Sequence, residues 1–145
     1  MTSITIARND ILTLFSTAWN AGPPSQGIAV LYDDSIGIKP KSGQPLLPWV
    51  RAVVRHLSGG QASLSNFNGV SRYRRSGIFT VQVFTPYGGG LSLSDSLVSV
   101  IVNAFEGKAS ANGVWFRQIR VNEIGQDGVW YQTNVLINFE YDEVK

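Results

Sequence analysis

The sequence predicts an α+β fold, with an antiparallel or mixed β-sheet of about five strands and two α-helices packed on one face. Two kinds of pattern predict it. Several segments alternate apolar and polar residues with a period of two, as half-buried strands do, and two others repeat apolar residues every three or four positions, as amphipathic helices do. The expected order is α-β-β-β-α-β-β. At 145 residues the chain suits a single domain, residues 1–145.

The two expected helices are residues 3–20 and a segment that begins at Ser92. An apolar stripe runs along the first, and Gly22 with the two prolines after it stops the helix. The second begins with a pattern similar to a capping box, in which Ser92 would pair with Asp95, and Gly107 is its expected stop. Because each stripe is one-sided, both helices are expected to cover the sheet.

Five segments are expected to be strands: residues 27–32, 49–57, 72–84, 114–121 and 129–141. The third is expected to have a bulge at residues 76–77. Its end is marked by Pro86 and three consecutive glycines, because proline cannot continue a ladder and glycine accepts positive φ.

Alternation in the second strand separates its two faces. His56 shares the apolar face, whereas Trp49 lies on the other face together with Arg51 and Arg55, which are about 13 Å apart. With Trp130 on the same outer surface, we expect a solvated sheet face that carries aromatic side chains and invites a partner.

A small, polar, glycine-rich segment follows the second strand, from Ser58 to Gly69. It is longer than a hairpin needs, and such loops are functional or mobile. We expect both here. The plain alternative is a tolerated insertion with no role.

The amino-acid composition narrows the classes of function that this chain can have. Charged residues make up 15% of the chain, well below the usual quarter, whereas aromatic residues make up 11%. Such a surface is compatible with permanent burial against neighbours, and equally with a slightly aromatic monomer. The net charge of +2 is too small to predict nucleic-acid binding. Neither a signal peptide nor a span of membrane length is found, so assembly in the cytoplasm is expected.

No residues are grouped in a pattern that predicts catalysis. The chain has no cysteine and a single histidine, His56, which excludes thiolate chemistry and a His-based triad or metal site. We expect His56 to be a hydrogen-bonded core or strand-end residue. The glycines at 88–90 precede a helix but lack the lysine of a phosphate-binding loop, so a simple turn is expected. The prediction is no enzyme, no cofactor and no metal.

The densest basic cluster consists of Arg72, Arg74 and Arg75 around Tyr73. Two functional interpretations are open: arginines that face a channel near DNA, or arginines that pair with acidic groups of a neighbouring subunit. Pairing is preferred, because a channel that passes DNA should not bind phosphates. A solvated strand end is the plain alternative. The candidate acidic counterparts are Asp33, Asp34, Glu140, Asp142 and Glu143.

Three pieces of the chain together resemble a known family. They are the strand-and-glycine unit Gly77–Gly90, the helix after it, and an ending that contains NGVWF at 112–116 and DGVWYQTNV at 127–135. The chain resembles the tail terminator proteins of long-tailed bacteriophages in these three pieces. Its length and the order of its helices and strands are also similar to theirs.

The resemblance implies a structural virion protein that forms a homohexameric ring at the head-proximal end of the tail tube. It implies three partners: further copies of the chain, the tail tube protein, and a head-completion or connector protein. DNA would pass through the ring without specific binding, and no membrane would be involved. Alternatives are another neck component, such as a head-closure or connector protein, and a small ligand- or nucleic-acid-binding module.

The resemblance also implies loops that are mobile in the free subunit and become ordered on assembly, with Ser58–Gly69 as the candidate. The predicted contacts with other subunits or with the tube are Arg51, Arg55, Ser58, Gly59, Gly60, Asn66, Phe67, Arg72, Tyr73, Arg74, Arg75, Tyr87 and Trp130.

Overall fold

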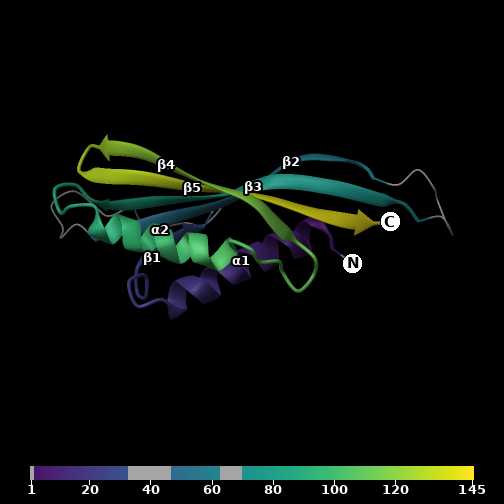
Figure 1. Cartoon of the computed structure of the whole chain (residues 1–145), viewed down its shortest axis with the longest axis horizontal. Helices are drawn as coiled ribbons and strands as arrows, with labels where there is room; N and C mark the ends of the chain where they lie inside the picture. Colours follow the sequence, from purple (N-terminus) through teal and green to yellow (C-terminus); the bar gives the residue numbers. More distant parts are fainter. Residues whose placement is uncertain (1, 33–46, 63–69) are drawn as a thin grey trace.

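The computed structural model describes residues 2–32, 47–62 and 70–145. In chain order its elements are α1 (Ile4–Ala21), β1 (Ala29–Tyr32), β2 (Trp49–Gln61), β3 (Arg72–Pro86), α2 (Ser92–Phe105), β4 (Trp115–Asp127) and β5 (Trp130–Val144). Both helices lie on one face of the sheet (Figure 1). The order and the two-layer arrangement confirm the predicted fold class. No helix within the described ranges is long and apolar enough to cross a membrane.

The strands form one mixed sheet in the order β1-β2-β3-β5-β4. β1 runs parallel to β2, and the other neighbours are antiparallel. The central pair, β3 and β5, is aligned along its whole length, from Arg72 opposite Val144 to Pro86 opposite Trp130. β4 therefore forms one edge of the sheet, and the four-residue β1 forms the other.

The core lies between the sheet and the helices. α1 buries Ala7, Ile11, Phe15 and Trp19, whose spacing of four residues puts them on one side of the helix. α2 contributes Leu97, Ile101, Ala104 and Phe105, and the sheet contributes the alternating apolar positions of β2, β3 and β5. The buried side of each helix lies within its predicted apolar stripe, although Ile4 and Leu93, the first residues of the two stripes, are exposed.

The capping box predicted for α2 is wrong. Leu91 is the N-cap and no side chain caps the helix. Asp95 donates its backbone N–H to the Leu91 carbonyl at 2.9 Å, so Ser92 is already helical and cannot take the extended backbone that a capping serine needs. Asp95 still lies in the first turn, where a negative charge is favourable. Gly107, with φ of 69°, follows the helix end as predicted.

The loop predicted from Ser58 begins too early. β2 continues through Gln61, paired with the beginning of β3, and Ala62 donates its N–H to the Arg72 carbonyl at 2.7 Å. The small side chains of this stretch suggested a loop, but β3 supplies a ladder for them. Residues 63–69, which include Asn66 and Phe67, lie outside the described residues.

The predicted bulge is present at the right level of the sheet but on the other strand. The β2–β3 register shifts between His56 and Ser58, so Leu57 of β2 is the extra residue. Gly77 faces His56 across this pair. A Cβ at Gly77 would lie 2.5 Å from the Phe139 ring and would clash with the Arg55 carbonyl, so only glycine lets Phe139 fill this space.

Candidate assembly surfaces

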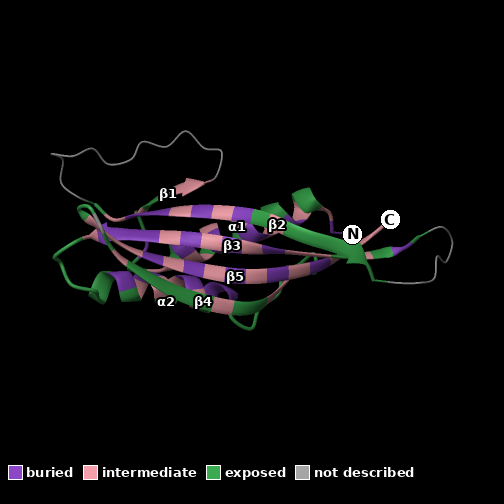
Figure 2. Ribbon diagram, turned by 90° about the horizontal axis from the view of Figure 1, so that it is seen from above, coloured by how far each residue is buried: buried purple, intermediate pink, exposed green. Residues whose placement is uncertain are grey.

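Most of the predicted contact residues that the structure describes lie at two ends of the sheet. We call the end where β2 begins and β3 ends the tryptophan end, after Trp49 and Trp130. We call the opposite end the arginine end; there β3 begins, β5 ends, and the β2–β3 hairpin extends beyond the helices (Figure 1). Seen from above, the ribbon of β2 changes from buried to exposed as it leaves the core toward this end (Figure 2).

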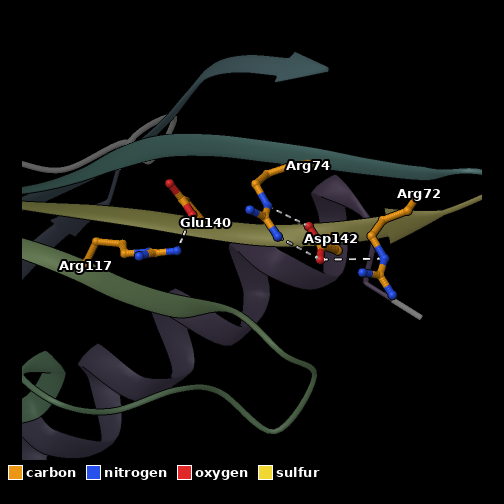
Figure 3. Close-up of polar contacts among 5 residues, drawn as sticks. All are labelled: Arg72, Arg74, Arg117, Glu140 and Asp142. Atoms are coloured by element: carbon orange, nitrogen blue, oxygen red, sulfur yellow. Dashed lines mark hydrogen bonds and ion pairs between the residues drawn. The ribbon is translucent and has the colours of Figure 1, made fainter. Parts of the chain in front are cut away.

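On the helix-free face of the arginine end, Asp142 of β5 binds two arginines of β3. Its carboxylate accepts hydrogen bonds from Arg74 Nε at 3.0 Å and Nη2 at 3.4 Å, and Arg72 Nε lies 3.9 Å away (Figure 3). The register explains this contact, since Arg74 and Asp142 are direct cross-strand partners. The hydrogen bond and the charge of Asp142 raise the pKa of Arg74 above its usual value.

Trp115 of β4 extends this cluster to the edge strand. The guanidinium groups of Arg74 and Arg117 lie 5.6 and 5.8 Å from its ring centroid. Arg117 Nη2 also lies 3.3 Å from a carboxylate oxygen of Glu140 (Figure 3). Three strands are thus joined on one face by stacked arginines and carboxylates.

On the helix side of the same end, Arg75 donates to Glu143 at 2.5 Å. This hydrogen bond raises the pKa of Arg75, and the side chains of both partners are mostly covered. The Lys145 ammonium lies over the Tyr73 ring, 5.6 Å from its centroid.

These contacts show that three of the predicted acidic counterparts, Glu140, Asp142 and Glu143, do meet arginines, but within one chain. Asp33 and Asp34 lie outside the described residues. Pairing of the cluster with a neighbouring subunit stays a prediction, and it would have to compete with these internal pairs.

The other predicted contacts lie along β2, where successive side chains alternate between the two faces of the sheet. Arg51 Nη1 donates to Gln82 Oε1 at 3.4 Å, and its guanidinium lies 5.7 Å from the Trp49 ring centroid. Arg55 lies four residues further along the strand and is exposed. Beyond the bulge, the hydroxyls of Ser58 and Ser76 are 2.8 Å apart, and Gly59 and Gly60 continue the ladder.

At the tryptophan end, aromatic rings pack on the helix-free face. Trp49 stacks on Phe84 with ring centroids 4.2 Å apart, and Trp130 meets Trp49 edge-on at 6.2 Å. The face predicted for Trp49 is therefore right, but the predicted solvation is wrong, because only 4% of the residue is exposed. Its Nε1 has no hydrogen-bond partner among the described residues.

Exposed apolar side chains surround these rings. Tyr87, a predicted contact, is 55% exposed, and its N–H donates to the Val129 carbonyl at 2.9 Å. Leu47, Leu91 and Val129 are also exposed at this end and were not predicted from the sequence. Val129 begins the predicted final strand and was expected on its apolar face, whereas Leu91 directly follows the three glycines, outside any predicted helix or strand.

Two shallow hollows flank the helices. One, of about 220 Å³, lies between α2 and β4 and is lined by Val102, Glu106, Phe116, Arg117, Ile119 and Val121. The other, of about 360 Å³, runs beside α1 and is lined by Asn9, Leu12, Thr13, Ser16, Thr17 and Tyr32. Neither brings an acid and a base together with a nucleophile. No group of side chains suited to a metal ion is found in the described part of the chain.

His56 is half-buried on the helix side, as predicted. Its ring lies edge-on to Phe139 and Tyr141, with centroids 5.4 and 5.8 Å away. Burial lowers its pKa, and the charges of Arg8 and Arg75 lower it further. The predicted hydrogen bond is wrong, because neither ring nitrogen has a partner among the described residues.

Comparison with known proteins gives one family and several similar folds. Residues 10–139 match the family model described as phage tail terminator protein. One solved structure aligns with 97% of this chain and 96% of its own, with a TM-score of 0.70 and 16% identity. A chain from the virion of a native gene transfer agent particle aligns over 94% and 98%, with a TM-score of 0.56 and 10% identity. No curated protein sequence matches.

Proposed function

The chain belongs to the phage tail terminator family and is a structural tail protein, and on that premise we propose that it forms a homohexameric ring on the head-proximal end of the tail tube. The ring stops tube polymerisation and provides the surface to which the head is joined. It acts through protein contacts, without catalysis or a cofactor, and DNA passes through it without specific binding.

One structural observation carries this proposal beyond the family: a single sheet connects two ends of different chemistry. A ring between a tube and a head needs two different axial surfaces. The tryptophan end offers exposed Tyr87, Leu47 and Val129, whereas the arginine end offers charged and polar groups on strands that extend past the helices. We therefore place the strands roughly along the ring axis.

Nucleic-acid binding is less well supported as the main function. Arg74, Arg75 and Arg117 each face a carboxylate of the same chain, which reduces the field available to phosphates. If DNA binding were the function, retention on DNA would fall steeply with salt.

The ring is tested by the mass of the purified full chain, alone and with tail tubes assembled without their terminator. Light scattering and electron microscopy should find ring-shaped particles, or added density at one end of each tube. A protein that stays monomeric under both conditions and leaves tube ends bare would contradict the proposal. A head-closure or connector role would instead predict binding to heads and none to tubes.

A further inference from the structure

The face of the sheet that no helix covers has an excess of positive charge. Figure 2 views the sheet from this side. Its side chains come from alternate positions of β2, β3, β5 and β4, because successive residues of a strand point to opposite faces. It carries six arginines and only two carboxylates, namely Arg51, Arg55, Arg72, Arg74, Arg117 and Arg120 with Glu140 and Asp142.

The other charged side chains that the structure describes show no such excess. They comprise four basic residues (Arg8, Arg75, Lys108 and Lys145) and five acidic ones (Asp10, Asp95, Glu106, Glu123 and Glu143). The asymmetry between the two groups is therefore larger than the net charge of +2 indicates. A one-sided excess of arginine attracts an anionic partner.

The two carboxylates of the helix-free face lie at its arginine end, where Asp142 and Glu140 pair with Arg74 and Arg117. Three rows of cross-strand partners nearer the tryptophan end contain no acidic residue on this face. These rows are Arg51, Gln82, Asn134 and Asn122, then Val53, Thr80, Leu136 and Arg120, then Arg55, Ile78, Asn138 and Gln118.

Two arginines of these rows, Arg51 and Arg120, face no carboxylate among the described residues. Arg51 donates to the neutral amide of Gln82 and lies over the Trp49 ring, so its charge is held in place but not neutralised. Arg120 is exposed on the edge strand β4. Both charges are available to a partner that approaches this face.

The spread of the arginines favours a long anion over a compact acidic site. Arg51 pairs with Gln82, ten residues from Arg72 along β3, so the arginines extend over about 33 Å of strand. Duplex DNA presents a negative charge about every 1.7 Å along its axis and can meet all of them.

A protein partner fits this face less well, because protein interfaces have an apolar centre. The apolar residues in the middle of the face, Val53, Ile78 and Leu136, are only partly exposed among longer polar side chains. The surface offered to a partner therefore consists mainly of guanidinium and amide groups, which suit phosphate oxygens.

We propose that the helix-free face lines the channel of the ring and contacts the phosphate backbone of the DNA that passes through. This rests on the proposed ring and names the face that meets DNA; the helices then lie on the outside. The contacts do not hold the DNA in one place, because they are independent of sequence and each departing phosphate is replaced by an equivalent one. The carboxylates beside Arg74 and Arg117 keep the attraction weak.

Salt-dependent binding of a short labelled DNA duplex to the full chain, measured by fluorescence anisotropy, tests the contact. Each phosphate contact that is lost should lower the slope of log affinity against log salt by about 0.9. Arg51→Gln with Arg120→Gln should therefore lower it by about two. Arg51→Lys with Arg120→Lys keeps both charges and should retain most of the slope. The matched control, Arg8→Gln with Lys108→Gln, removes two exposed charges elsewhere and should leave the slope nearly unchanged.

Cysteine labelling of rings on tail tubes tests the placement, because the natural chain has no cysteine. Asn122→Cys introduces a thiol at an exposed position of the helix-free face, and Thr13→Cys introduces one on α1. A small maleimide should react with both variants. A maleimide on a polymer too bulky for the channel should react only with Thr13→Cys. Melting temperatures check that every variant folds.

The outcomes separate this face from the ring itself. Rings that form normally, with the same salt slope for the natural chain and for Arg51→Gln with Arg120→Gln, overturn the DNA contact and leave the proposed function standing. A natural chain that binds no DNA at low salt overturns it as well. Asn122→Cys that reacts with neither reagent would place the face in a protein contact, and reaction with both would place it outside. If no ring forms on tubes, the proposed function and the channel fail together.

Discussion

The two ends of this molecule share strands β3 and β5 but are held together by different interactions. At the tryptophan end, Trp49, Phe84 and Trp130 bury one another on a face that no helix covers. At the arginine end, the ion pairs of Arg72 and Arg74 with Asp142 are partly exposed to water, and only Arg75 with Glu143 is mostly covered. Stability and specificity are thus unequally distributed along the sheet. Aromatic burial stabilises the first end, whereas exposed charge pairs contribute little energy and mainly favour one register.

The largest effect should come from the tryptophan end. Trp49→Ala removes a ring that is almost completely buried, and it should lower the free energy of unfolding by about 3 kcal/mol or more. Trp49→Phe should cost less, because a ring can still stack on Phe84. Chemical denaturation of both variants measures the difference. A loss for Trp49→Ala as small as that of a surface substitution would mean that the rings are not packed as described.

The next effect lies where the core ends and the arginine end begins. Gly77→Ala places a Cβ against the Phe139 ring and the Arg55 carbonyl, so the β2–β3 pair must shift. We expect a loss of about 1–3 kcal/mol, as for other overpacked sites. Gly60→Ala is the matched control, since a Cβ there meets no atom within 4 Å. Equal stability of the two variants would refute the close approach of Phe139.

The third effect depends on pH and belongs to the arginine end. Because burial lowers the pKa of His56, the unfolded chain binds a proton more readily than the folded one. Stability should therefore fall as pH drops below the ordinary histidine value of 6.5 toward the lowered one. His56→Phe should flatten this part of the profile measured by thermal denaturation. A profile unchanged by the substitution would show that His56 titrates as it does in the unfolded chain.

The smallest effect should come from the exposed ion pairs. Arg74→Gln removes one of the two arginines that Asp142 binds, yet the melting temperature should change little, and less still at high salt. Assembly on tubes is the more sensitive readout for this variant. A large, salt-independent loss of stability would reverse the comparison between the two ends.

The helices and strands were predictable from the sequence because their apolar periodicity can be read from neighbouring residues. Alternation identified the core faces of β2, β3 and β5, and the stripes identified α1 and α2, because burial repeats with the period of each element. It could not show that Arg74 faces Asp142, since that depends on the β3–β5 register, nor that Phe84 covers Trp49. Local composition misled at Ser58, where pairing with β3 overrides the loop signal. It also misled at Ser92, because Leu91 already occupies the N-cap position.

The candidate surfaces were predictable only in part. Tyr87 and Trp130 stood out as aromatic residues near the glycine turn and the final strand. The α2–β4 groove did not, because sequence order does not reveal which strand is at an edge. Strand order β1-β2-β3-β5-β4 puts β4 there, although it precedes β5 in the chain.

A tube-growth assay would show whether this protein ends the tail tube. Tail tube protein is allowed to polymerise in the presence and absence of the full chain, and tube lengths are measured by electron microscopy. The account predicts that growth stops, with ring-shaped density at one end of each tube. Tubes that keep growing at the same rate with bare ends, at concentrations where the protein is folded, would contradict it.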